Sequence, residues 1–425
     1  MPDAYVRRVL INRNYALFMG GSFVSALGSW FQGVAIGWLV LDLSDSPFVL
    51  GLANFAQMAP LFFLGFAGGV LADRVDRRSL LLGGMAVGMA AVSLLAALAL
   101  AGQASVPAIL AASLLLGLTN AVVWPAWQPF IKDLVPLDRL REAIAFNSAR
   151  FNLTRVLGPA LAGVLLAGFG APFCLAIAAL SSAGVLIATW LIRRPRTPRA
   201  RPAPWLSALD EGVRYVRGDG FTLRLLLVTG AYGFLVLPYQ AFLPAFARDV
   251  LRTGAEGLGA LLTAVGIGAV LGALLTGTQA VADQPGRSMA LFALAGGSGL
   301  AAFAVATPAN GYPAWMAMPS LVMVGLGSIG YLTTANSTLQ LRVPDALVGR
   351  VMGLWVVVNA GTAPLGSLAL GSAAERFGLP LVVFWCGLVG IGIGVSALLT
   401  GAFADTPDEA LAIPVVARSE DAAAS

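Results

Sequence analysis

Twelve long apolar stretches dominate this sequence and leave it few ways to fold. Each has roughly the 20 residues that a helix needs to cross a bilayer. Only 11% of all residues are charged, against about 25% in soluble domains, and the alternating pattern of a membrane β-barrel is absent. We predict an all-α membrane protein with transmembrane helices at residues 15–41, 48–71, 80–101, 107–131, 143–168, 172–192, 223–248, 257–281, 288–306, 313–340, 347–372 and 379–402.

The longest connection divides these segments into two sets of six. It begins with "RRPRTPRARPAP", whose prolines prevent a continuous helix or strand. In the following "WLSALDEGVRYVR", Leu206, Leu209, Val213 and Val216 recur at helical spacing, so we expect a short amphipathic helix on the membrane surface. The predicted units are a six-helix bundle over 1–192, a linker over 193–222, a second six-helix bundle over 223–402 and a disordered tail over 403–425.

The positive charges predict an orientation. With the N-terminus in the cytoplasm, 21 of the 26 Lys and Arg residues lie on the cytoplasmic side of this arrangement and three on the other. Cytoplasmic loops are enriched in these residues, so both termini and the linker are expected in the cytoplasm, with the chain in the cell membrane. The high pI of about 9.6 then reflects contact with anionic lipid rather than with nucleic acid.

The two sets of helices form an internal repeat. At an offset of 208 residues, Pro136 falls on Pro344 and Pro172 falls on Pro380 without a gap, and several glycines between them coincide as well. Parallel repeats of this kind are typical of secondary transporters, which bind their substrate near the membrane midplane between the repeats.

The stretch "GVLADRVDRRSLL" at 69–81 resembles the signature that follows the second helix of the major facilitator superfamily, with Asp76 in place of its inner glycine. The helix number and the repeat extend this resemblance over essentially the whole chain. "GSWFQGVAIGWLV", "LVPLDRLREAIAFNSARFNLTRVLGPALAG" and "EGVRYVR" resemble the drug and siderophore exporter branch, which includes enterobactin exporters and macrolide efflux proteins. The resemblance implies two pseudo-symmetric six-helix bundles.

In that superfamily the signature is a conformational switch. The resemblance implies that Asp73, at the end of the second helix, contacts Arg350 at the start of the eleventh and stabilises the outward-facing state. A basic loop that only sets the topology is the alternative. The implied switch residues are Gly69, Asp73, Arg74, Arg77, Arg78 and Arg350.

Polar and aromatic side chains recur inside the apolar segments. Such groups are costly in lipid and face the bundle interior, where amides and aromatic rings suit a bulky amphiphilic substrate. Alternatively they only join helices to one another. The candidate cavity residues are Ser29, Trp30, Gln32, Asn54, Gln57, Asn120, Trp124, Gln128, Asn152, Arg155, Tyr239, Gln240, Asn336, Gln340 and Asn359.

Arg155 lies near the middle of the fifth segment. It is expected either to serve substrate binding or coupling, or to anchor the structure. Directly after it, Gly158, Pro159 and Gly163 resemble the Gly-Pro motif of exporters on that helix.

No acidic residue lies in the middle of a predicted helix. The nearest candidates for a proton-carrying group are Asp42, Asp249 and Glu142, all at helix ends. For Asp42 the alternative is a solvated helix end. Proton coupling therefore follows from the resemblance rather than from these residues.

We predict a secondary active transporter that exports a hydrophobic or amphiphilic small molecule by alternating access, coupled to protons. The alternatives are an uncoupled facilitator or lipid flippase, a transporter-like receptor, and an intramembrane enzyme. No cofactor and no metal site are expected; a metal site built on His is excluded, because the chain has no His. The expected partners are the small-molecule substrate, membrane lipids and protons, with no nucleic acid, and the protein is expected to be a monomer.

Overall fold

The computed structural model describes residues 12–192, 205–401 and 403, and these are almost entirely helical. In the described residues, eleven continuous helical stretches are long and apolar enough to cross a membrane. Those of the first half are α2 (Arg13–Ser44), α3 (Pro47–Arg74), α4 (Arg77–Leu100), α5 (Val106–Leu134) and α6 (Leu140–Leu191).

Helix α6 contains two membrane spans, which brings the total to the twelve predicted. It runs for 52 residues, but Gly170 inside it has φ +79° and ψ 170°. A side chain at this φ is strained, so glycine permits the chain to reverse here without a loop. Pro172 then begins the second span at a position where a missing N–H costs little. The predicted fifth and sixth segments thus meet at Gly170.

The second half begins with α7 (Trp205–Gly218), the predicted amphipathic helix. The membrane-length stretches that follow are α8 (Gly220–Leu235) with α9 (Tyr239–Ala245) and a π-helical turn (Phe246–Val250), α10 (Gly254–Thr276), α12 (Pro285–Val305), α13 (Ala317–Arg342), α14 (Asp345–Phe377) and α15 (Leu379–Thr400). Short helical turns lie at η1 (Leu137–Arg139), α11 (Gln279–Asp283), η3 (Pro308–Asn310) and η4 (Ala314–Met316).

The seventh span differs from the continuous helix predicted over 223–248. After α8, the N–H groups of Val236 and Leu237 both donate to the carbonyl of Tyr232. Pro238 and Pro244 follow, and neither has an N–H to donate. The chain therefore interrupts the helix, restarts it as α9 and widens it into the π-helical turn.

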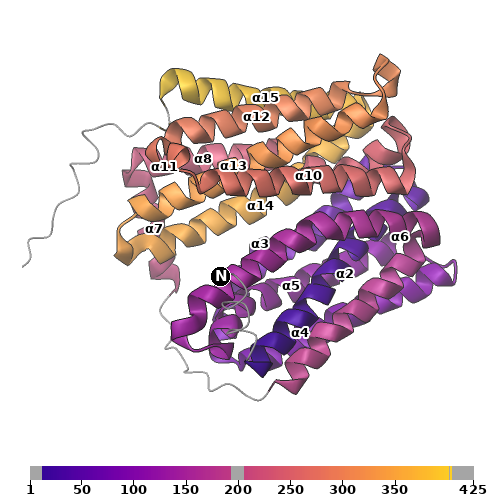
Figure 1. Cartoon of the computed structure of the whole chain (residues 1–425), viewed down its shortest axis with the longest axis horizontal. Helices are drawn as coiled ribbons and strands as arrows, with labels where there is room; N and C mark the ends of the chain where they lie inside the picture. Colours follow the sequence, from indigo (N-terminus) through magenta and orange to yellow (C-terminus); the bar gives the residue numbers. More distant parts are fainter. Residues whose placement is uncertain (1–11, 193–204, 402, 404–425) are drawn as a thin grey trace, which may run out of the picture.

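The helices form two bundles that lie side by side (Figure 1). In the first half α2 packs on α6, and both α3 and α4 pack on α5; in the second half α10 and α12 pack on α13, and α12 also packs on α15. Glycines permit close approach: a Cβ at Gly21 would lie 2.7 Å from the carbonyl oxygen of Gly184. Between the bundles, α3 packs on α14 and α6 on α10.

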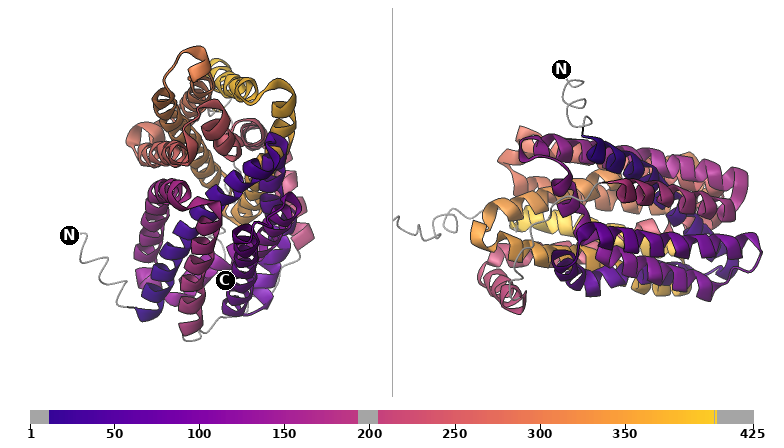
Figure 2. Two further views of the ribbon diagram at one scale, coloured as in Figure 1. Left: turned by 90° about the vertical axis from the view of Figure 1, so that its right-hand side faces the viewer. Right: turned by 90° about the horizontal axis from the view of Figure 1, so that it is seen from below.

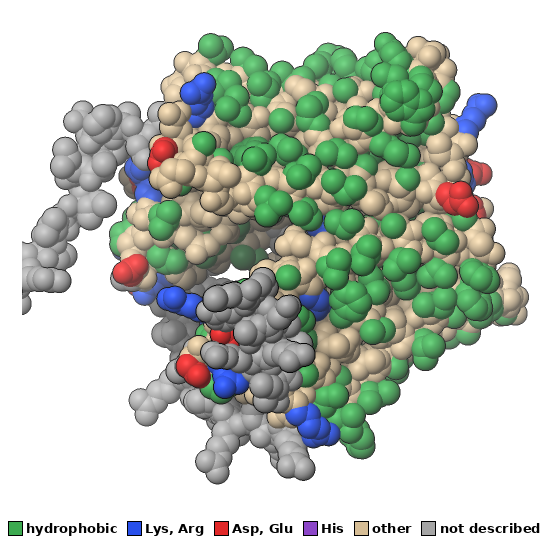
Figure 3. All heavy atoms as spheres, viewed as in Figure 1, with side chains coloured by type: hydrophobic (Ala, Val, Ile, Leu, Met, Phe, Trp, Pro, Cys, Tyr) green, Lys and Arg blue, Asp and Glu red, His purple; other side chains and the backbone are tan. Residues whose placement is uncertain are grey.

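The helices run between two opposite ends of the molecule. At one end α2 is followed by α3, and the π-helical turn is followed by α10; we call this the Arg248 end. The opposite end contains α7 and the connection between α3 and α4, and we call it the α7 end. Figure 2 shows the bundles from two further sides. In Figure 3 apolar side chains cover the flanks, and a hollow between the two halves opens toward the α7 end. Exposed Leu94, Leu180 and Leu274 belong to the apolar surface that a bilayer would cover.

The predicted linker and tail are described only in part. Residues 193–204 and 404–425 lie outside the described residues. Helix α7 is not isolated on a surface, because it packs on α14 and α8. Phe403, the first residue of the predicted tail, is 3% exposed and its ring lies 6.5 Å from that of Tyr331, so the folded part continues beyond α15.

Candidate transport pathway

The two halves contact one another from the Arg248 end to about the middle of the helices. On one side of the pathway, Asn54 of α3 donates to the hydroxyl of Ser367 on α14 over 3.1 Å. The Ser367 hydroxyl donates to the carbonyl of Pro364 in its own helix over 2.7 Å and lies 3.3 Å from the carbonyl oxygen of Gly51 on α3. Nearer the Arg248 end, Ser46 hydrogen-bonds Glu375. The three contacts between the helices hold α3 against α14.

On the other side, α6 meets α10 through glycines. A Cβ at Gly163 would lie 2.6 Å from the Cα of Gly259, and a Cβ at Gly266 would lie 2.6 Å from the carbonyl oxygen of Arg155. No real Cβ can be so close, so these helices touch through their backbones. Gly163 of the predicted Gly-Pro motif therefore lies at an interface between the halves. Gly158 and Pro159 are buried as well, and Gly158 packs against the ring of Trp30.

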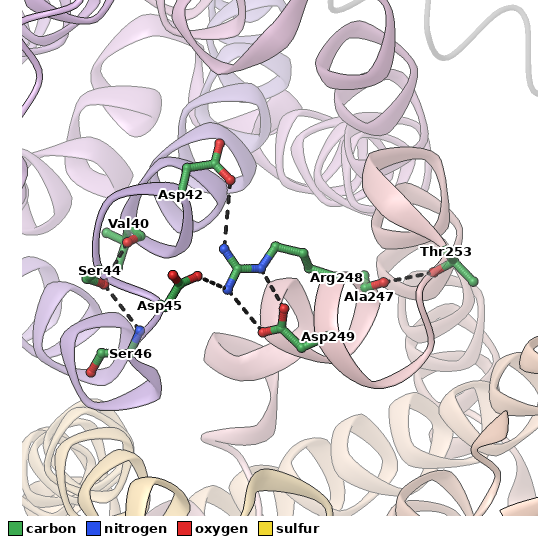
Figure 4. Close-up of polar contacts among 9 residues, drawn as sticks. All are labelled: Val40, Asp42, Ser44, Asp45, Ser46, Ala247, Arg248, Asp249 and Thr253. Carbon is green, nitrogen blue, oxygen red and sulfur yellow. Dashed lines mark hydrogen bonds and ion pairs between the residues drawn. The ribbon is translucent and has the colours of Figure 1, made fainter. Parts of the chain in front are cut away.

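A group of four charged residues joins the halves at the Arg248 end (Figure 4); we call it the Arg248 cluster. The guanidinium of Arg248, in the π-helical turn, lies 2.6 Å from a carboxylate oxygen of Asp45, 2.7 Å from one of Asp249 and 3.9 Å from one of Asp42. Asp42 and Asp45 belong to the end of α2, in the other half. One cation thus bridges three carboxylates.

The sequence identified only part of this cluster. Asp42 and Asp249 were expected as possible coupling residues at matching positions of the two halves, whereas Asp45 and Arg248 were not singled out. The sequence did contain a signal for them. Arg248 stands at the end of the predicted segment 223–248, and Asp42 and Asp45 follow the predicted segment 15–41 at the matching end of the other repeat. Asp45 has φ 49°, in the left-handed region that Asp tolerates better than most residues.

The predicted cavity residues differ in exposure. Trp124 is 61% exposed and lies on a face of α5 other than that of exposed Leu114 and Leu118, while its neighbour Val123 is buried. Tyr239 is buried, and its hydroxyl accepts from the amide of Gln240 over 3.3 Å. The side chain of Gln128 is outside the described ones. Ser29, Gln240 and Gln340 are exposed; Trp30, Gln32, Asn54, Gln57, Asn120, Asn152, Arg155, Asn336 and Asn359 are partly exposed.

These polar residues do not all have one role. Asn54 joins the two halves, as described above, so the predicted alternative of helix-to-helix contact applies to it. Asn152 donates to the carbonyl of Ser148 within its own helix, and the amide of Gln340 donates to Asn336 over 2.6 Å. The substrate role of the set stays a prediction.

The basic residues of the signature hold the first half together at the α7 end. Arg77 pairs with Asp133 at 3.1 Å, and Arg78 donates to the carbonyls of Thr189 and Trp190 over 3.0 and 2.5 Å. Asp76 accepts from the N–H of Ser79 over 3.0 Å and so caps α4. Its place in the signature thus has a local structural reason.

Two glycines of the signature have different surroundings. A Cβ at Gly69 would meet nothing within 4 Å, whereas one at Gly68 would overlap the carbonyl of Ala121 on α5. Close packing of α3 on α5 therefore requires glycine at Gly68, whereas the predicted switch residue is Gly69. Arg74 is exposed.

Arg350 forms an ion pair that the sequence did not predict. Its guanidinium binds the carboxylate of Glu211 on α7, and a Cβ at the adjacent Gly212 would lie 3.3 Å from the Cβ of Arg350. The side chain of Asp73 is outside the described ones, so the Asp73–Arg350 contact stays a prediction. The signal for the Glu211 contact was the acid within the amphipathic helix.

The end of α7 is fixed by further polar contacts. Arg342 of α13 lies 3.6 Å from a carboxylate oxygen of Asp219 and 4.4 Å above the ring of Phe221. Burial and the nearby Asp219 carboxylate raise the pKa of Tyr215, against the opposing effect of Arg342. A tyrosine with its ordinary pKa is already neutral at physiological pH, and the raised pKa keeps the Tyr215 phenol so. The contacts of Arg342 with Asp219 and Phe221 attach the end of α7 to the second half.

Glu142, the third predicted coupling residue, lies in the first turn of α6. One of its carboxylate oxygens is buried and has no hydrogen-bond partner among the described residues. The structure contains no ion pair between Glu142 and a described cation. Its role in coupling stays a prediction.

Relatives of known name cover nearly the same length. The staphyloferrin A transporter of Staphylococcus aureus is 26% identical over 367 residues, which are 85% of this chain and 90% of the relative. The enterobactin exporter EntS of Shigella boydii is 27% identical over 380 residues, 85% of this chain and 88% of the relative. The similarity extends over both bundles.

Solved transporters share the fold. The nucleoside transporter NupG superposes with a TM-score of 0.72 at 12% identity, over 92% of this chain and 100% of that one. A bacterial homologue of the human lysosomal transporter Spinster, solved inward-facing and unoccupied, gives a TM-score of 0.65 at 17% identity, over 94% and 96%. The predicted fold is confirmed. The family model of transmembrane secretion effectors matches residues 10–413, and this chain therefore belongs to that family of the major facilitator superfamily.

Proposed function

We propose that this transporter exports a small amphiphilic molecule of the siderophore or drug class across the cell membrane by alternating access. The observation that carries the proposal is the asymmetry of the pathway. The Arg248 cluster and the glycine contacts close one end, while the hollow opens at the α7 end (Figure 3). The named relatives transport or export siderophores, which supports this substrate class.

The α7 end is cytoplasmic in this proposal, because the Lys and Arg residues gather there. In a background without Cys174 and Cys386, an exposed residue at each end is replaced by Cys: Gln103 at the Arg248 end and Thr278 at the α7 end. In intact cells an impermeant maleimide should label Gln103→Cys and leave Thr278→Cys unlabelled until the membrane is opened. The reverse pattern would invert the orientation and the direction of export.

The function is tested with purified protein in proteoliposomes. Four kinds of compound are offered, with and without a pH gradient: enterobactin, erythromycin, ethidium and, separately, a siderophore of the carboxylate class. Net flux of at least one compound supports transport, and its acceleration by the gradient supports proton antiport. Binding without flux would support the receptor alternative.

A specific observation favours an uncoupled facilitator as the second candidate. Asp42, Asp249 and Glu142 lie in the first or last turns of their elements, and the middle of each described span lacks a carboxylate. In that case flux of the same compound should be unchanged when the pH gradient is collapsed with an ionophore.

A further inference from the structure

Two arginines lie well inside the described spans, both on α6. Arg150 and Arg155 are separated by five residues and lie beyond the first two turns of that helix. A cation at this depth is expensive and needs a partner or water. Comparing their surroundings shows what each can do.

Arg150 is fully engaged by protein groups. It donates to the carbonyl of Ser22 over 3.0 Å and to the side-chain oxygen of Asn147 over 3.1 Å. The first contact ties α6 to α2. Arg150 is thus an anchor inside the first half.

Arg155 has no such partner. No described residue forms an ion pair or hydrogen bond with its guanidinium, which is partly exposed. The hydroxyl of Tyr239 on α9, in the other half, is close enough to interact with it electrostatically. Its own carbonyl is packed against Gly266, so the backbone is fixed while the charged group remains available.

The transport cycle makes this arrangement costly unless an anion joins it. When a pathway open at one end closes around its substrate, water around Arg155 is displaced, and an unpaired buried charge is strongly unfavourable. A carboxylate or sulfonate can accept two parallel hydrogen bonds from a guanidinium. Trp30, which packs on Gly158 one turn along α6, and exposed Trp124 supply aromatic surface for an apolar body.

We propose that Arg155 binds an anionic group of the transported molecule and that the substrate is an amphiphilic anion. This inference rests on the proposed export function and adds the charge of the substrate and the residue that recognises it. The charge neutralised at Arg155 then favours closure around a loaded site over closure around an empty one.

The test uses two fluorescent probes of the same skeleton. 1-Anilinonaphthalene-8-sulfonate is an anion, and N-phenyl-1-naphthylamine lacks the sulfonate. Each is titrated onto the full chain in lipid nanodiscs, and binding is followed by energy transfer from tryptophan, with empty nanodiscs subtracted. Arg155→Gln should weaken binding of the anionic probe by about tenfold or more, as expected for a lost charge-assisted bidentate contact, and leave the neutral probe within about twofold.

Arg150→Gln is the matched control on the same helix. It should lower the melting temperature but keep the preference for the anionic probe, because its guanidinium is occupied by Ser22 and Asn147. If Arg155→Gln does not fold, Arg155→Lys replaces it: the charge stays but the planar fork is lost, so anionic binding should fall several-fold with neutral binding unchanged.

Equal weakening of both probes, or unchanged binding of the anionic probe in the Arg155 variants, would overturn the proposal and make Arg155 a structural residue. The binding measurement needs no flux across a membrane. Its failure therefore leaves the export proposal standing, and a lack of flux in proteoliposomes leaves the binding result standing.

Discussion

Arg78 shows how a residue that sets topology can also stabilise the fold. The last carbonyls of a helix have no partner within it, and Arg78 binds two of them at the end of α6. The guanidinium thereby joins the start of α4 to the end of the sixth span. The alternative of a loop that serves topology alone is too simple for this residue.

Arg78→Gln should therefore lower the free energy of unfolding by about 1–3 kcal/mol, since two hydrogen bonds to a charged donor are lost. The melting temperature in detergent reports this change. Arg74→Gln is the matched control, because Arg74 has the same charge four residues earlier and is exposed; it should stay within about 0.5 kcal/mol of the parent. Equal losses in both variants would assign the effect to net charge.

The sequence indicated which charged residues matter better than it indicated what they contact. The sequence pointed to Asp42, Asp249 and Arg350 as charged groups worth attention, because charges are rare near these apolar segments. It did not give their partners: Asp45 and Arg248 are 203 residues apart. Contacts across such a separation depend on the packing of whole helices and leave no local pattern.

At the scale of elements, the spans could be predicted because their length and hydropathy are imposed by the bilayer. The break between α8 and α9 could not, although Pro238 stands at it and Pro244 lies within α9. Proline within a membrane helix is tolerated wherever neighbours satisfy the freed groups, and α5 continues through Pro125 and Pro129. The same residue thus leaves one helix intact and interrupts another.

For helix α7 we predict a part in conformational change. Glu211 binds Arg350, the residue for which Asp73 of the other half is the predicted partner. If both acids use the same guanidinium, Glu211 favours the state open at the α7 end and Asp73 favours the state closed there. The amphipathic helix would then oppose the switch.

Glu211→Gln should shift the population toward closure at the α7 end by up to about fivefold, because the pair is partly exposed and such pairs contribute at most about 1 kcal/mol. Spin labels at Lys132→Cys and Thr278→Cys, one in each half, would report the distance. Asp210→Asn is the control, since Asp210 pairs with Arg214 inside α7. A distribution unchanged by Glu211→Gln would remove α7 from the switch.

At the scale of the whole molecule, the Arg248 cluster is the main polar link between the two bundles. Three carboxylates gather around one guanidinium, and Asp42 and Asp45 come from the opposite half to Asp249. Removing the cation removes the attraction and leaves like charges close together. The cluster therefore stabilises the state closed at this end.

Arg248→Gln should shift the population toward opening at the Arg248 end by about tenfold or more. Labels at Gln103→Cys and Ala309→Cys, exposed positions in different halves, would show longer distances. Arg252→Gln controls for the loss of one exposed positive charge nearby and should leave the distances as they are. Identical distributions in the parent and in Arg248→Gln would show that packing alone closes this end.

The glycine contacts between α6 and α10 have a kinetic consequence. Gly163 and Gly259 meet through their backbones, so no side chain at this contact has to change rotamer when the bundles separate. The activation barrier for opening then includes the ion pairs of the Arg248 cluster together with the hydrogen bonds between α3 and α14. Screening by salt, with a Debye length of about 10 Å at 0.1 M, should speed opening in stopped-flow fluorescence. In Arg248→Gln the three carboxylates repel one another across the halves and salt weakens that repulsion, so salt should slow opening of this variant instead.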